Sequence, residues 1–265
     1  MTIVVKVGGA AGNELAGALD EIAASPDRFV VVHGGSEEVD RWGTALGRPS
    51  RYYTSPSGVV SRYTDESRME VVVLALAGAV QTRIVREFAV RGVRAVGLSG
   101  TDGGVVLARR KHGTRALENG RIVHLVDDRA GSIESVAPDL LERLRAGGYL
   151  PVLGPPALTP EGEIVNVDAD RIAAEVARAL HAEALVLLTN VGGVRRDPED
   201  PTSRFDRVGP QNEAEVLAAA RGRMHKKVRA ALDARAGGVL RAVIGASSGT
   251  TPIARCLAGD GTVFA

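Results

Sequence analysis

The chain of 265 residues contains a single cysteine, Cys256. One cysteine excludes a disulfide framework and a cysteine-based zinc site, and it fits a reducing compartment. No secretory signal is expected, because Lys6 stands where an apolar segment would continue. The longest apolar run, residues 71–80, is about half the length that a membrane-spanning helix needs. We therefore expect a cytoplasmic protein that binds no membrane.

The chain also lacks an excess of charge, with 33 Lys and Arg against 32 Asp and Glu. This balance disfavours a nucleic-acid or anionic-membrane partner. Disorder is excluded, because 45% of the residues are hydrophobic and can fill a sizeable core. The length suits one large α/β domain or two lobes of roughly 100–170 residues each.

Two common nucleotide-binding motifs are missing. No G-x-x-x-x-G-K-[ST] sequence occurs, nor any Gly-Lys pair, which excludes a P-loop. No G-x-G-x-x-G occurs either, so the dinucleotide fingerprint is absent. Any phosphate site must therefore take its lysines from elsewhere in the chain.

What is present is a repeated alternation of strand, glycine turn and helix. Continuous apolar, β-branched runs occupy residues 3–7, 29–33, 95–98, 149–153, 184–188 and 242–244. Such runs indicate parallel strands covered on both faces. Between them, apolar residues recur every four positions, as in Ile172, Val176 and Leu180, and in Met224, Val228 and Leu232. The pattern predicts a doubly wound α/β sandwich with a mostly parallel sheet.

Two polar stretches interrupt this alternation. Residues 105–126 carry Asn119-Gly120 and predict β-hairpins at the edge of the sheet or over a site. Residues 195–212 predict a long loop. If two lobes exist, we place their boundary near residue 175, giving lobes 1–175 and 176–265.

Glycine pairs end the first two predicted strands, at Gly8-Gly9 and Gly34-Gly35. Such pairs can present backbone amides to a phosphate, and the carboxyl ends of parallel strands are where α/β sheets bind ligands. Tight turns without a ligand are the alternative, and for either pair alone the odds are even.

Two lysines, Lys6 and Lys227, could serve such a site. Lys6 lies two residues before Gly8, within reach of a phosphate held by the turn, although a strand lysine alone often marks a solvated edge. Lys227 flanks the apolar stripe of its helix and can face inward, whereas Lys226 points toward solvent.

Polar residues also precede two predicted helices. Asp168 and Asp170 precede the helix of Ile172, so one should cap it and the other is free to pair with a lysine. Thr64 or Asp65 would cap the earlier apolar helix that contains residues 71–80. Arg62, at the start of that helix, can bind a carboxylate through two hydrogen bonds or remain a surface arginine.

Together these residues resemble the amino acid kinase family. The resemblance rests on motifs in the family's order: Lys6-x-Gly8-Gly9, His33-Gly34-Gly35, Arg62 with Thr64-Asp65, Asn166 with Asp170, Thr189-Asn190-Val191-x-Gly193-Val194, Gly222-x-Met224-x-x-Lys227 and Gly261-Thr262. It implies a three-layer αβα sandwich of the carbamate kinase type, with an acceptor lobe followed by an ATP lobe. Within the family, the chain is most similar to the N-acetylglutamate kinase branch.

Finer features resemble the LysW-type kinases of that branch: Ser36 after the glycine pair, Val60-Ser61 before Arg62, Gly154-Pro155-Pro156 and Gly222-Arg223-Met224. Those kinases phosphorylate the side-chain carboxylate of 2-aminoadipate or glutamate whose amino group is linked to the C-terminal glutamate of a small acidic carrier protein. Two alternatives remain. One is a kinase of free N-acetylglutamate, and the other is a non-catalytic nucleotide- or amino-acid-sensing module with the same fold.

The resemblance implies a role for each candidate residue. Lys6, Lys227 and Asp170 would be catalytic, and Gly34, Gly35, Arg62 and Asn166 would bind the acceptor. The nucleotide would be bordered by Gly8, Gly9, Thr189, Asn190, Val194 and Met224, although many relatives have Asp where this chain has Asn190. The basic residues Arg109, Arg110, Lys111 and Arg115 would bind the carrier protein, unless they are only a solvated hairpin. ATP would bring Mg²⁺ through its own oxygens, without protein metal ligands, and the assembly would be a homodimer.

Overall fold

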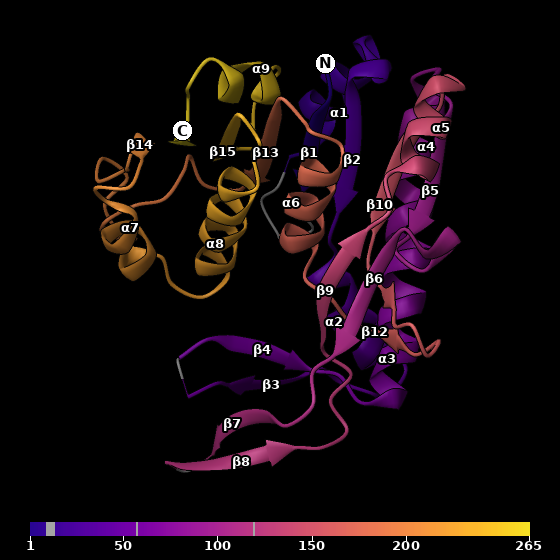
Figure 1. The fold of residues 1–265 in the computed structure, drawn as a ribbon, viewed down its shortest axis with the longest axis vertical. Helices are drawn as coiled ribbons and strands as arrows, with labels where there is room; N and C mark the ends of the chain where they lie inside the picture. The colour runs from indigo at the N-terminus through magenta and orange to yellow at the C-terminus, as the bar shows by residue number, and fades with distance from the viewer. Residues whose placement is uncertain (9–13, 57, 119) are drawn as a thin grey trace.

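The computed structural model describes residues 1–8, 14–56, 58–118 and 120–265 and is built around an eight-stranded sheet (Figure 1). The strand order is β14-β16-β15-β13-β1-β2-β10-β5, and every neighbouring pair is parallel except β15 and β16. The six predicted strands are confirmed as β1 (Ile3–Val7), β2 (Phe29–His33), β5 (Ala95–Ser99), β10 (Leu150–Gly154), β13 (Ala184–Thr189) and β15 (Arg241–Ala246). The short strands β14 (Arg207–Val208) and β16 (Thr262–Phe264) complete one edge.

Helices cover both faces of this sheet and make the predicted three-layer sandwich. One face packs against α5 (Asp139–Ala146), α6 (Ala169–Ala179), α7 (Glu213–Ala219) and α8 (Arg223–Ala236). The other face packs against α1 (Ala16–Ala24), α2 (Ser36–Ala45), α9 (Pro252–Leu257) and a long helix composed of α3 (Glu66–Val73), the π-helical η2 (Leu74–Val80) and α4 (Gln81–Val90). Short 3-10 turns, η1 (Pro26–Arg28) and η3 (Asp102–Gly104), complete the helical segments.

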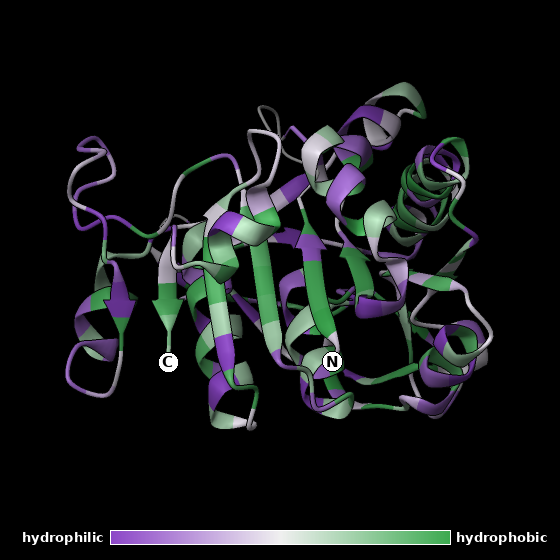
Figure 2. Ribbon diagram, turned by 90° about the horizontal axis from the view of Figure 1, so that it is seen from above, coloured by the Kyte–Doolittle hydropathy of each residue, from purple (hydrophilic) through white to green (hydrophobic). Residues whose placement is uncertain are grey.

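The alternation of side chains along β1 directs Lys6 toward one helical layer. Val5 and Val7 belong to the apolar cluster beneath α1 and α2, whereas Val4 belongs to the cluster beneath α6 and α8. Because successive strand residues point to opposite faces, Lys6 lies on the side of Val4. Figure 2 shows how apolar the strands around it are, which makes a lysine there exceptional.

Two β-hairpins extend from one end of the sandwich and lie side by side (Figure 1). The hairpin of β7 (Thr114–Glu118) and β8 (Arg121–Leu125) confirms the prediction for residues 105–126, although Asn119 itself lies outside the described residues. The other, of β3 (Arg51–Thr54) and β4 (Val60–Tyr63), was not predicted. A four-stranded sheet of β12 (Ile164–Val165), β11 (Ala157–Leu158), β6 (Val106–Arg110) and β9 (Gly131–Val136) connects them to the sandwich.

The predicted division into lobes 1–175 and 176–265 stays a prediction. Residue 175 lies inside α6, and β1 pairs with β2 on one side and with β13 on the other. The loop predicted at 195–212 contains β14 and buries Phe205 and Val208. No described helix combines the length and the hydrophobicity required to cross a bilayer.

Two helical glycines make a matched test of this packing. A Cβ on Gly17 of α1 would lie 2.1 Å from the carbonyl oxygen of Gly249, whereas a Cβ on Gly78 of η2 would meet nothing within 4 Å. We expect Gly17→Ala to lower the free energy of unfolding by about 1–3 kcal/mol through overpacking against backbone. Gly78→Ala should raise it by about 0.5–1 kcal/mol because alanine favours the helix. Urea titration of both variants measures the difference, and equal stability would contradict the close approach at Gly17.

Candidate active site

The centre of the site is one carboxylate between two ammonium groups. Lys6 Nζ lies 2.9 Å from Asp170 Oδ1, and Lys227 Nζ lies 3.0 Å from each carboxylate oxygen. All three side chains are buried: Lys6 and Asp170 are 6% exposed and Lys227 is 9% exposed. The convergence of these residues, predicted from sequence, is confirmed.

Each member reaches this point for a local reason. Asp168 caps α6 by accepting hydrogen bonds from the backbone amides of residues 170 and 171, which places Asp170 in the first helical turn. A carboxylate is favourable there because of the helix dipole. Lys227 lies on the buried side of α8, which packs on α6.

The prediction that Lys226 points only to solvent is wrong. Its Nζ lies 3.8 Å from Asp168 Oδ2, and both side chains are partly buried. The reason is that α8 crosses close to the first turn of α6, so two successive lysines reach two acidic residues two positions apart.

The triad contains two ammonium groups and one carboxylate, so its ionised form has one positive charge in excess. Burial works against ionisation of Asp170, but Lys227 and Lys6 overcome it and hold the pKa of the carboxyl well below its usual range. Burial also opposes the charge on Lys6, but Asp170 raises its pKa. For Lys227, burial dominates and the repulsion from Lys6 adds to it, so its pKa is lowered despite Asp170. An anion that approaches Lys227 would therefore meet a cation whose charge is only partly compensated.

The glycine segment after β2 lies directly beside this triad. A Cβ on Gly34 would stand 3.8 Å from Lys6 Nζ, and one on Gly35 would lie 2.7 Å from Leu76 Cδ2 of η2. Gly34 therefore lines the site beside Lys6, and a side chain at position 35 would displace Leu76. Gly8 follows β1 at the same edge, and Gly9 lies outside the described residues.

His33 supports this segment from beneath without carrying charge. The ring is buried, its Nε2 lies 3.4 Å from Gln81 Oε1, and a Cβ on Gly154 would collide with it. Burial lowers the pKa of His33 to about 4, so the imidazole is neutral near pH 7.

Arg62 is already engaged by the protein. Its Nη1 donates to Asp40 Oδ1 at 2.6 Å and to Ser50 Oγ, and its Nη2 donates to the carbonyl oxygen of Ser36 at 3.0 Å. Burial disfavours ionised Asp40, but the hydrogen bond from Arg62 leads the interactions that lower its pKa. The structure therefore holds Arg62 in place and gives it an acidic partner that the sequence analysis missed. Asp40 lies one helical turn after Ser36, a spacing that could have indicated a shared face.

Asn166 lies between the hairpins and α6. Its Nδ2 donates to Thr64 Oγ1 at 3.2 Å, and its backbone amide donates to the carbonyl oxygen of Arg129. Asp65, not Thr64, caps α3 through the amide of residue 68. Buried Asp128 accepts from the amide of Thr64, which ties the base of one hairpin to the other.

Besides Gly8 and Gly9, four residues are expected to border a nucleotide, and they occupy different environments. Thr189 ends β13 and is buried, with Asn190 next to it. Val194 is fully buried, and its amide donates to Thr262 Oγ1 at 2.8 Å, so it anchors the loop. Met224 is partly buried at the start of α8. Among the described residues, no group of three or more His, Cys, Asp or Glu side chains is arranged to hold a metal ion.

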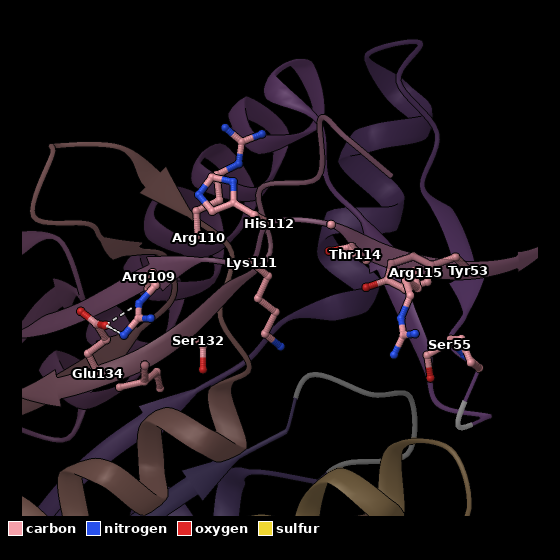
Figure 3. A pocket seen from close by; sticks show the side chains of 13 residues that line it. Tyr53, Ser55, Arg109, Arg110, Lys111, His112, Thr114, Arg115, Ser132 and Glu134 are labelled. Carbon is pink, nitrogen blue, oxygen red and sulfur yellow. Dashed lines mark hydrogen bonds and ion pairs between the residues drawn. The ribbon is translucent and has the colours of Figure 1, made fainter. Parts of the chain in front are cut away.

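The basic segment lines a cavity of about 1220 Å³ between the two hairpins and β9 (Figure 3). Arg109 is neutralised by Glu134, and Arg110 by Glu163 at 3.3 Å. Lys111 extends into the open space, while Arg110 and His112 extend to the other side of the strand (Figure 3). Within the described part of the chain, neither Lys111 nor Arg115 has a carboxylate within 4.0 Å. Desolvation by the surrounding chain, together with the charges of Arg171 and Lys226, lowers the pKa of Lys111, although its side chain is exposed.

Comparisons with known proteins agree with this architecture. The profile described as "Amino acid kinase family" matches residues 1–246. A LysW-aminoadipate kinase of Deinococcus radiodurans is 44% identical over 98% of this chain and 90% of its own length. An acetylglutamate kinase of Symbiobacterium thermophilum is 37% identical over 91% of this chain and 82% of its own length. The carbamate kinase from Giardia lamblia bound to AMP-PNP superimposes with a TM-score of 0.67 at 13% identity, over 99% of this chain and 98% of that one, and so shares the fold. The chain belongs to the amino acid kinase family.

Proposed function

We propose that this protein transfers the γ-phosphoryl group of ATP to the side-chain carboxylate of 2-aminoadipate or glutamate whose amino group is linked to a LysW-type carrier protein. The product is an acyl phosphate in amino-acid biosynthesis. The observation that carries the proposal is the buried Lys6–Asp170–Lys227 triad at the carboxyl end of β1. The high identity to a LysW-aminoadipate kinase supports the choice of acceptor.

The chemical difficulty of this reaction is electrostatic. The acceptor carboxylate is already ionised near neutral pH, so it needs no general base to attack phosphorus. Two anions must instead be brought together, and the charge on the transferring group must be stabilised in a water-poor site. A buried triad with one excess positive charge is suited to this task.

The family resemblance assigns a separate role to each of the two ammonium groups. Lys6, beside Gly34, lies along the transferring phosphoryl group, and Lys227 neutralises the oxygen of the leaving β-phosphate. Asp170 is a positioning residue that holds both lysines at 2.9–3.0 Å. The amides of Gly8 and Gly35 would donate hydrogen bonds to phosphate oxygens. The amide of Gly34 donates to the carbonyl oxygen of Val7 at 3.3 Å, so Gly34 contributes its lack of a side chain beside Lys6. Mg²⁺ would be supplied with ATP and would offset part of the charge on its phosphates.

The remaining residues hold the two substrates. Arg62 and Asn166 orient the acceptor, and Thr189, Asn190, Val194 and Met224 border the nucleotide. In this proposal residues 1–175 mainly serve the acceptor and residues 176–265 mainly serve ATP. The open cations of the basic segment, Lys111 and Arg115, attract the acidic carrier, with Arg109 and Arg110 supporting the same surface. The assembly we propose is a homodimer, in line with the family resemblance.

An assay of three acceptors tests the proposed function. We expect ATP-dependent hydroxamate formation with carrier-linked 2-aminoadipate or glutamate and little with free N-acetylglutamate, because the free molecule lacks the carrier surface. Exclusive use of free N-acetylglutamate would replace the proposed acceptor, and no product with any acceptor would favour a sensing module.

Substitutions in the triad separate catalysis from stability. Lys6→Met or Lys227→Met should lower kcat at least about a hundredfold by removing a transition-state contact. Either variant leaves one lysine paired with Asp170, so the free energy of unfolding should change little. Asp170→Asn should lower it by about 3 kcal/mol, because two buried ammonium groups then lack a counter-charge.

Lys226→Met is the matched control, since Lys226 neighbours Lys227 but makes only a 3.8 Å ion pair with Asp168. It should retain near-normal kcat and stability in the same turnover and urea measurements. Near-normal turnover of Lys6→Met, or equal stability of Asp170→Asn and the wild type, would refute the assigned roles.

The lowered pKa of Lys227 predicts an alkaline limit to activity. A lysine whose pKa is depressed loses its charge before the pH reaches the ordinary lysine value of 10.5. As the pH rises, kcat/KM for ATP should therefore begin to decline at a pH lower than 10.5. Lys227→Arg keeps its positive charge at higher pH. When each pH profile of kcat/KM is scaled to its own maximum, the decline in the Lys227→Arg variant should begin at a higher pH than in the wild type. An unchanged limb in Lys227→Arg would show that another group sets it.

A further inference from the structure

A hydroxyl at the start of α2 joins side chains from distant parts of the chain. Ser36 Oγ accepts a hydrogen bond from Arg62 Nη2 at 3.2 Å and another from Arg223 Nη2 at 3.1 Å. Arg62 comes from β4, whereas Arg223 is the first residue of α8. One neutral oxygen therefore lies between two guanidinium groups, one from each of the two proposed lobes.

These two arginines differ in how their charges are compensated. Arg62 is paired with Asp40 at 2.6 Å. Within the described residues, Ser36 Oγ is the only hydrogen-bond partner of the Arg223 guanidinium, and no carboxylate lies within 4.0 Å of that group. Arg223 is exposed, and a guanidinium carries five N–H donors, of which this contact uses one. Arg223 thus presents a full charge and open donors at the mouth of the site.

The position of Arg223 on α8 directs it toward the reacting groups. Arg223 and Lys227 are four residues apart in one helix, so their side chains share a face. Lys227 is the buried end of that face, at the triad, and Arg223 is the outer end, beside Ser36. A substrate that extends from the triad along this face of α8 would lie beside Arg223.

The acceptor proposed above supplies an anion for this position. Glutamate has two carboxyl groups, and the bond to the amino group of 2-aminoadipate uses one of them. The other stays ionised, so a carrier-linked acceptor has one more carboxylate than a free N-acetyl amino acid. A planar guanidinium is matched to a carboxylate in shape and charge.

We propose that Arg223 binds this remaining carboxylate of the carrier's terminal glutamate and so distinguishes a carrier-linked acceptor from a free one. The inference rests on the proposed function. Arg62 serves the 2-aminoadipate part of the same acceptor, and Ser36 keeps the two guanidinium groups side by side. One acceptor molecule would thereby contact both proposed lobes, one through Arg62 and the other through Arg223.

A small-molecule pair isolates the contact. The acceptors are two dipeptides in which glutamate acylates the amino group of 2-aminoadipate, one with the remaining glutamyl carboxylate free and one with it converted to a carboxamide. Wild-type enzyme should show a KM about tenfold or more higher for the carboxamide, as loss of a charge-assisted hydrogen bond implies. Arg223→Gln should raise KM for the free carboxylate by a similar factor and bring the ratio near one, with KM for ATP unchanged. Arg223→Lys, which keeps the charge, should restore part of the ratio.

Arg229→Gln is the control, because Arg229 is an exposed arginine of the same helix, six residues farther along. It should keep the wild-type ratio. If Arg223→Gln keeps that ratio, or raises KM for ATP instead, the assignment of Arg223 is overturned while the proposed function stands. If wild-type enzyme accepts only free N-acetylglutamate, the proposed function fails and the inference fails with it.

Discussion

The arrangement of this site depends on one buried carboxylate. Asp170 contacts Lys6 from β1 and Lys227 from α8 while belonging to α6, so a single side chain connects three elements that are distant in sequence. Its position depends in turn on Asp168, which caps the helix one residue before it begins. A buried ammonium without a counter-charge is very costly, so the two lysines can be held inside only while Asp170 stays ionised.

The net charge of the protein is near zero, but the triad has a local excess of positive charge that can stabilise anionic groups. The positive charge is concentrated where water is scarce, and there each ion interacts more strongly than at the surface. Farther out, Arg62 and Arg109 are compensated by Asp40 and Glu134, whereas Lys111 remains open to solvent. Surface charge of this kind steers a partner more than it holds one, because salt screens it.

Rigid support surrounds this charge. The neutral ring of His33 fills the space beside Gly154, and Gly35 packs so closely on η2 that a Cβ there would displace the side chains of Leu76 and Val80. The π-helical turns of η2 continue α3 into α4 beside the glycine segment, a distortion that often accompanies functional sites. The glycine amides near Lys6 are therefore fixed by packing before any ligand arrives, which is the condition for electrostatic catalysis.

The sequence by itself determined the layers and the identity of the central residues. Uninterrupted β-branched runs predict strands, and four-residue apolar spacing predicts α6 and α8, because both signals come from local periodicity. Only the tertiary structure decided which charges meet. The pairing of Arg62 with Asp40, the ion pair of Lys226 with Asp168 and the approach of Arg223 to Ser36 all depend on how separate elements cross. Local periodicity states which face of an element is apolar, but the partner of a polar side chain is set by packing between segments that no short stretch of sequence encodes.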